Sequence, residues 1–166
     1  MSDGVSFGEL WNAAKDVAVL FQNGESVNMT SRAFAVPAGK QPMDLDWTSQ
    51  ADRTMQVTWK GDSYASDIGI SSGTKMRIGA KWMAGGRLEG RGLFLHDAYL
   101  YCVFDDISLA QSFEVTGAFG DAVLVGQTAE LSGWIRVNWK QFRVDWGSWQ
   151  YDIKVRGDGS GTMSRI

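Results

Sequence analysis

Residues 133–157 read GWIRVNWKQFRVDWGSWQYDIKVRG, and this stretch specifies its own structure more completely than any other part of the chain. Gly147-Ser148 has the chemistry of a two-residue hairpin turn, because glycine at the first turn position takes a positive φ at little cost. A turn there places Trp146 opposite Trp149 and gathers apolar and aromatic pairs on one face and polar pairs on the other. Turn chemistry and side-chain period agree, so the sequence predicts a β-hairpin.

Similar alternating segments, separated by glycine-containing turns, follow one another through most of the chain. Thr54–Lys60 and Met76–Trp82 each place apolar residues on one side, and Gly85-Gly86 is predicted to turn the second of them back on itself. Ala98–Phe104 is apolar on both faces, which favours a central strand. About ten such segments without βαβ alternation predict an all-β fold, an antiparallel β-sandwich or barrel.

The N-terminal segment has a different pattern. Ser6–Glu9 matches a capping box, and apolar residues follow at helical spacing, which predicts one short amphipathic helix over residues 7–15. Residues 16–22 fit either a continuation of this helix or a strand; we favour the strand, because VAVLF is rich in strand formers and the hairpin signal Asn23-Gly24 follows it. A second strand is then expected over residues 25–36.

Length and composition limit the classes of function. The 166 residues fit one domain (1–166), with the helix at 7–15 and the β-sandwich or barrel over 16–166. A net charge of −3 without a basic run argues against nucleic-acid binding as the function. Cys102 is the single cysteine, which rules out an internal disulfide. Residues 1–7 lack the pattern of a signal peptide, so we expect a cytoplasmic protein or one released by a non-classical route.

No residue pattern argues for catalysis or for a metal or cofactor. His96 and Cys102 lie on one face of an extended strand but about 20 Å apart, beyond the hydrogen-bond reach that a nucleophile and its base need. The acidic pairs Asp44/Asp46 and Asp105-Asp106 are typical of turns at strand ends. We therefore expect a non-enzymatic protein with no metal and no cofactor.

The aromatic residues carry the functional hypothesis. Tryptophan is abundant, at eight residues, and an aromatic ring with a polar edge suits sugars, choline headgroups and the membrane interface. The alternative is that these rings pack in the core. The candidate ligand-binding residues of the hairpin region are Trp134, Trp139, Trp146, Trp149 and Tyr151. Phe7 and Trp11 are candidate membrane contacts. Trp134 and Trp139 are predicted to point to opposite sides of their strand, which leaves one of them for outside contact.

The chain resembles actinoporin-like and related small cytolysins in four places: the predicted helix, the segment VAVLFQNGESV, the cluster from Trp134 to Tyr151, and the tripeptide Arg156-Gly157-Asp158. The resemblance implies a β-sandwich with an N-terminal amphipathic helix and an aromatic site for choline lipids. The adjacent tyrosines and tryptophans of that family's lipid site are not present in order. Arg156-Gly157-Asp158 also spells the cell-adhesion tripeptide, for which chance occurrence beside a glycine turn is the alternative.

The expected function is that of a binding protein that recognises a lipid headgroup or a glycan, with peripheral membrane contact. Two alternatives stay open. A closed, lipocalin-like barrel would carry a small apolar ligand in an internal cavity. A self-assembling subunit of the coat or tail type would form a homo-oligomer through exposed strands.

Overall fold

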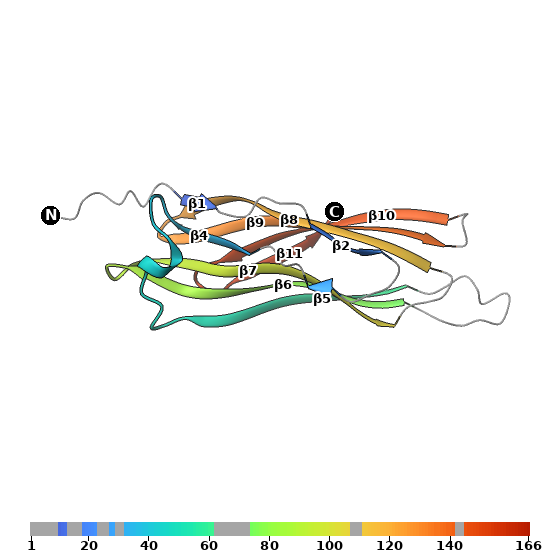
Figure 1. Cartoon of the computed structure of the whole chain (residues 1–166), viewed down its shortest axis with the longest axis horizontal. Coiled ribbons are helices and arrows are strands. Elements are labelled where there is room, and N and C mark those ends of the chain that lie inside the picture. The colour runs from blue at the N-terminus through green and yellow to red at the C-terminus, as the bar shows by residue number, and fades with distance from the viewer. Residues whose placement is uncertain are drawn as a thin grey trace.

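The computed structural model describes residues 10–12, 18–22, 27–28, 32–61, 74–106, 111–141 and 145–166. Eleven strands and one short 3₁₀ helix make up these residues (Figure 1). They are β1 (Leu10–Asn12), β2 (Ala18–Gln22), β3 (Val27–Asn28), β4 (Ala33–Pro37), η1 (Pro42–Asp44), β5 (Ala51–Gly61), β6 (Thr74–Leu88), β7 (Arg91–Asp106), β8 (Gln111–Val125), β9 (Thr128–Gln141), β10 (Asp145–Arg156) and β11 (Gly161–Arg165). The predicted all-β class is confirmed, and the described residues form eleven strands where about ten were expected.

The strands form one curled, mixed sheet in the shape of a half-barrel, so that β5–β7 face β8–β10 across the core (Figure 1). One group has the order β5-β6-β7-β4-β1, and the other has the order β2-β8-β9-β10-β11. The groups join where Leu93 of β7 pairs in parallel with Thr128 of β9. All other pairings among the described strands are antiparallel. The predicted central strand is confirmed, because β7 pairs with β3, β4, β6 and β9.

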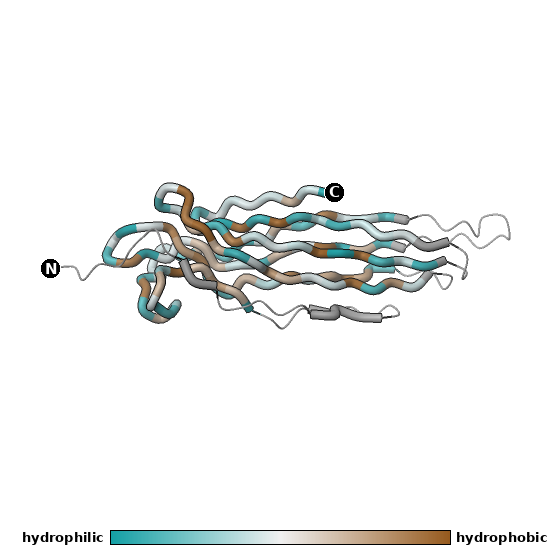
Figure 2. The backbone as a smooth tube through the Cα atoms, turned by 90° about the horizontal axis from the view of Figure 1, so that it is seen from above, coloured by the Kyte–Doolittle hydropathy of each residue, from teal (hydrophilic) through white to brown (hydrophobic). Residues whose placement is uncertain are grey.

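Alternation along the strands produces the core. Hydrophobic and hydrophilic residues follow one another along the long strands (Figure 2), and a period of two sends them to opposite faces of the sheet. The largest fully buried side chains come from both groups of strands. They are Phe94, Met76, Ile78, Leu95, Leu100, Leu131, Ile135, Ile153, Val36 and Val115. The two groups therefore share one apolar interior.

The hairpin prediction was right in kind and wrong in register. Asp145 pairs with Gln141, so the chain reverses between these two residues, and Gly147-Ser148 lies within β10. Trp149 pairs with Val137 instead of Trp146. In the observed register, apolar residues at odd positions on β9 meet apolar residues at odd positions on β10. This register contains twelve residue pairs in all, and the predicted turn would have interrupted the alternation along them.

The glycines of β6 serve close packing and not a turn. β6 continues through Gly85 and Gly86 to Leu88, and the chain reverses at Glu89-Gly90, which corrects the predicted turn. A Cβ on Gly86 would come within 2.4 Å of the Trp47 indole, so the absence of a side chain lets the ring lie on the strand. The alternation of β5 is confirmed, with Met55, Val57 and Trp59 half-buried between exposed neighbours.

The predicted N-terminal helix is wrong where the structure describes it. Residues 10–12 form β1, which pairs with β4; the rest of the 7–15 range lies outside the described residues. An isolated helix of nine residues is only marginally stable, whereas β4 offers backbone partners. The strand expected over 16–22 is confirmed for 18–22, which form β2, while 16–17 lie outside the described residues; the range 25–36 includes β3 and most of β4. β2 pairs with β8 while β3 pairs with β7, so the two do not form a simple hairpin.

Within the described residues, no helix is long and apolar enough to cross a membrane.

Candidate functional site

An aromatic cluster fills the space between the two groups of strands. The rings of Trp59 on β5 and Trp149 on β10 stack with centroids 4.7 Å apart. Phe113 on β8 meets Trp59 edge-on at 5.8 Å and lies 5.4 Å from Phe104 on β7. Trp149 is 6% exposed, and its Nε1–H has no partner among the described residues. Phe113 and Trp149 are buried, and Trp59 and Phe104 are partly buried against the core, so the cluster packs between the two groups of strands.

The structure separates the predicted ligand-binding residues. Trp149 and Tyr151 are buried in the core. Trp139 is half-buried against the core and lies over Gly147, where a Cβ would come within 2.4 Å of the indole nitrogen. Trp134 is half-buried on the opposite face of β9, as its position in the strand predicted.

The remaining candidates are placed less fully. Trp146 is in β10, opposite Lys140, and Trp11 is in β1, opposite Val36. Phe7 lies outside the described residues.

Polar side chains surround Trp134 on the outer face of β9 and β10. Asp152 pairs directly with Trp134 across the strands, and Gln150 pairs with Arg136. Arg136 donates a hydrogen bond to Gln150 (Nη2 to Oε1, 3.0 Å), and Gln150 donates one to Asp152 (Nε2 to Oδ1, 3.0 Å). The Arg136 guanidinium also lies 5.6 Å from the centre of the Trp134 ring. We call these four residues the outer-face row.

The outer-face row combines a flat ring with donors and acceptors fixed in one line. The hydrogen bonds hold the amide of Gln150 between a cation and a carboxylate, so its rotation is restricted. The Trp134 indole is only half-buried, so part of the ring can contact a ligand, and such a ring offers an apolar surface with a polar tip. The row can therefore bind a polyhydroxylated ligand, but it contains no pair of groups arranged for proton transfer.

Backbone hydrogen bonds close the half-barrel at the end where β6 meets β10. Gly85 N donates to Gly157 O (2.8 Å), and Gly157 N donates to Ala129 O (2.9 Å). The indole Nε1 of Trp82 donates to the carbonyl oxygen of Arg156 (3.0 Å). A Cβ on Gly157 would lie 2.0 Å from the carbonyl oxygen of Leu93. The two groups of strands are thus joined here by backbone hydrogen bonds, and there is no room for a side chain at Gly157.

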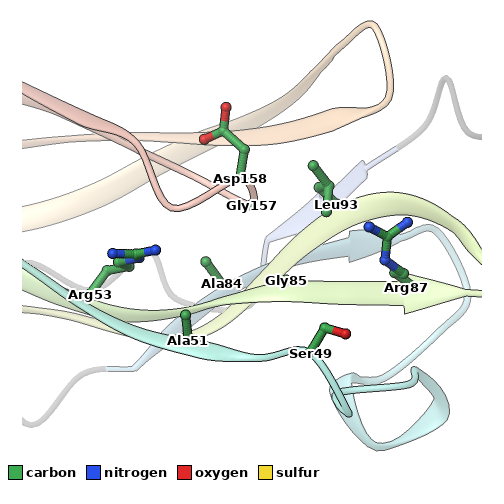
Figure 3. Close-up of a pocket in the computed structure, with 9 residues that line it drawn as sticks. All are labelled: Ser49, Ala51, Arg53, Ala84, Gly85, Arg87, Leu93, Gly157 and Asp158. Atoms are coloured by element: carbon green, nitrogen blue, oxygen red, sulfur yellow. The ribbon is translucent and has the colours of Figure 1, made fainter.

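A cleft of about 170 Å³ opens beside this junction (Figure 3). Its lining comes from β5, β6, β7 and the two connections before β5 and after β10. The lining residues are Ser49, Ala51, Arg53, Ala84, Gly85, Arg87, Leu93, Gly157 and Asp158. In Figure 3 the side chains of Arg53 and Arg87 stand at opposite ends of the cleft, and Asp158 points away from the others. No sequence pattern indicates this site, because its residues are far apart in the chain.

His96 and Cys102 stay separate on β7, where they pair with Met83 and Ile78. Burial raises the pKa of the Cys102 thiol to about 12, so it stays protonated near neutral pH. His96 lies against Trp47, with ring centroids 4.1 Å apart, and burial lowers its pKa. The expected separation of the two residues is confirmed.

The acidic residues considered as ligands have local structural partners. Asp44 accepts a hydrogen bond from the backbone N–H of Gln41 (2.8 Å), and Asp105 accepts from Arg77 (2.9 Å). Asp46 accepts from both the backbone N–H and the hydroxyl of Thr48. The described residues contain no group of three or more side chains that could hold a metal ion.

The tripeptide 156–158 is not presented as an exposed loop. Arg156 binds Glu130 (Nε to Oε2, 2.8 Å), and Gly157 is buried. A receptor could not bind the guanidinium without first breaking this ion pair.

Comparisons of the chain with protein-family models, with curated proteins and with solved structures found no match. The function is therefore argued from the geometry of the chain itself.

Proposed function

We propose that this chain is a non-enzymatic glycan-binding protein that uses the outer-face row, with Trp134 as the surface on which a sugar ring packs. The observation that carries the proposal is the hydrogen-bonded line from Arg136 through Gln150 to Asp152, directly beside the half-buried indole. Amide, carboxylate and guanidinium groups bind neighbouring sugar hydroxyls, and the ring covers the less polar face of the sugar.

The surroundings of Trp134 favour a glycan over a lipid surface. Insertion into a membrane requires a continuous apolar area around the aromatic anchor. On β9 and β10 the neighbours of Trp134 are polar or charged, whereas Ala118 lies opposite it on β8. The exposed large hydrophobics among the described residues do not pair with Trp134; they are Met43, Val123, Val125 and Ile166. A cytolysin-like membrane contact would instead need residues that the outer-face row does not supply.

The test is a glycan array followed by calorimetry on any glycan that binds. We expect Trp134→Ala to weaken binding by about tenfold or more, because a ring contact and its buried area are lost together. Trp134→Phe keeps a flat ring and should retain most of the affinity. Glu89→Gln changes an exposed carboxylate in the turn between β6 and β7, away from the row, and serves as the control.

Phosphatidylcholine vesicles with and without sphingomyelin form the second arm of the experiment. Binding to vesicles without binding to any glycan would replace the proposal with lipid-headgroup recognition. Equal glycan affinity of the wild type and Trp134→Ala would show that the outer-face row is not the site.

Self-association is a second candidate, favoured by the edge strand β5. Among the described strands β5 pairs with β6 alone, so its other edge can accept a strand from a second copy. An antiparallel pairing of two β5 strands about Gln56 places Asp52 opposite Lys60, an attractive charge pair on both sides of the twofold axis. Light scattering tests it: a dimer that Lys60→Asp dissociates and Asp52→Lys/Lys60→Asp restores supports the pairing, and a monomeric wild type excludes it.

A further inference from the structure

The cleft beside the β6–β10 junction has a floor of small residues and backbone. Ala51 and Ala84 pair across β5 and β6, and Gly85 and Gly157 complete the floor. Gly85 has φ +94, and a Cβ there would come within 2.6 Å of the Ser49 carbonyl oxygen. The main chains of separate segments approach closely at this point, so the space above them stays open (Figure 3).

The acidic side chains around the cleft have hydrogen-bond partners of their own. Asp158 accepts hydrogen bonds from the backbone N–H (2.8 Å) and the hydroxyl (2.7 Å) of Ser160. Asp46, whose backbone pairs with Arg87, is held in the same way by Thr48. Hydrogen bonding to Ser160 and to Thr48 lowers the pKa of Asp158 and of Asp46, respectively. Both carboxylates are thus engaged locally.

The two arginines have no ion pair among the described residues. Arg53 is opposite Trp82 in the β5–β6 register, and Arg87 follows five residues later on β6. The two backbone positions are therefore roughly 15 Å apart at the usual rise of a strand. Arginine side chains extended from both ends can place their guanidinium groups on either side of one small anion between them.

We propose that this cleft binds a tetrahedral oxyanion, sulfate or phosphate, through Arg53 and Arg87. A carboxylate offers one edge, which a single guanidinium fork can satisfy. A tetrahedral oxyanion directs oxygens outward in several directions, so it accepts from two forks and from the Ser49 hydroxyl at once. A volume of about 170 Å³ accommodates such an ion with a few water molecules. The inference is independent of glycan binding, because the outer-face row lies on the other group of strands.

The experiment is a titration of the ¹⁵N-labelled full chain with sodium sulfate, followed by NMR at an ionic strength matched with sodium chloride. We expect saturable shifts of the Gly85 and Gly157 amides that chloride does not produce. Arg53→Gln or Arg87→Gln should each weaken binding by about tenfold or more, since each removes hydrogen bonds to a charged group. Arg91→Gln removes the same charge from an exposed position outside the cleft and should leave the affinity unchanged.

Further arms identify the chemistry and its source. Sodium phosphate should bind as sulfate does. Galactose 6-sulfate binding more tightly than free sulfate, with galactose inactive, would support a sulfate ester as the source, whereas tighter binding of the free ion would support an inorganic oxyanion. The proposal is overturned if sulfate gives no saturable shifts, if acetate binds as tightly, or if both arginine variants bind like the wild type.

Discussion

Gly157→Ala is the substitution that most directly tests the junction between the two groups of strands. The new Cβ would lie 2.0 Å from the oxygen and 2.4 Å from the carbon of the Leu93 carbonyl, and 2.7 Å from the nitrogen of Phe94. All three atoms belong to the backbone, so no side chain can rotate away to relieve the contact. The chain must instead move at Gly157, whose N–H and C=O both hold the junction.

The size of the effect follows from these contacts. Overpacking a tight site costs about 1–3 kcal/mol. Movement of Gly157 also weakens its bonds to Ala129 O (2.9 Å) and from Gly85 N (2.8 Å), each worth about 1 kcal/mol. We therefore expect Gly157→Ala to lower the free energy of unfolding by about 3–5 kcal/mol. That is a large part of the stability of an ordinary domain.

Urea unfolding followed by tryptophan fluorescence measures this loss. Gly120→Ala is the matched control, because its Cβ would meet a single atom, Ser132 O, at 3.9 Å, so we expect a change within about 0.5 kcal/mol. Gly157→Ala with a loss below about 1 kcal/mol would refute the reasoning, since the backbone contacts at the junction could not then be as close as described.

Three further predictions concern side chains near the core. In parallel urea unfolding, Trp82→Phe should lower the free energy of unfolding by about 1–2 kcal/mol more than Trp149→Phe does. The reason is that the indole N–H of Trp82 has an acceptor, whereas that of Trp149 has none among the described residues. Equal losses for the two variants would contradict this. Arg156→Leu should lower the free energy of unfolding by about 2–4 kcal/mol, because it leaves buried Glu130 without its closest cation. The double variant Arg156→Leu/Glu130→Leu should recover most of this lost stability. Burial lowers the folded-state pKa of His96 below 6.5. Its contribution to stability is therefore fully present above 6.5, begins to fall there, and is lost as pH falls through the lower folded-state pKa; chemical unfolding of His96→Gln across this range should show a weaker pH dependence than the wild type.

The all-β class was predictable from alternation and turn chemistry, but the register of the last hairpin was not. Apolar residues keep odd positions through Trp139, change to even positions at Phe142, and return to odd positions at Trp149. A hairpin bend is possible at either switch between odd and even positions. The glycine at position 147 led the prediction to the second switch. The structure pairs Gln141 with Asp145, on either side of the first switch, and β9 and β10 then form twelve pairs.

Glycine misled the prediction for a physical reason. The same residue type permits a turn and permits close approach of two backbones, and the sequence alone does not distinguish these uses. Gly85, Gly86 and Gly147 all serve packing: they lie against Ser49, Trp47 and Trp139, respectively. The helix at 7–15 failed at residues 10–12 for a related reason, because pairing with β4 depends on residues that are distant in the chain.

The candidate site was predictable in part. The opposite directions of Trp134 and Trp139 followed from their spacing on β9, and the structure places them so. The partners of Trp134 did not follow, because Gln150 and Asp152 reach it through the corrected register. The cleft between Arg53 and Arg87 depends on the curl of the whole sheet, and no local pattern in the sequence indicates it.

The most direct test of the account is to follow the indole ¹H–¹⁵N resonances, assigned by single Trp→Phe variants, while a glycan identified on the array is added. We expect the Trp134 resonance to shift with saturation, while the resonances of Trp59 and Trp149 in the aromatic cluster stay where they are. Shifts of Trp59 and Trp149 with Trp134 unchanged would contradict it, because the ligand would then lie inside the half-barrel and not on its outer face.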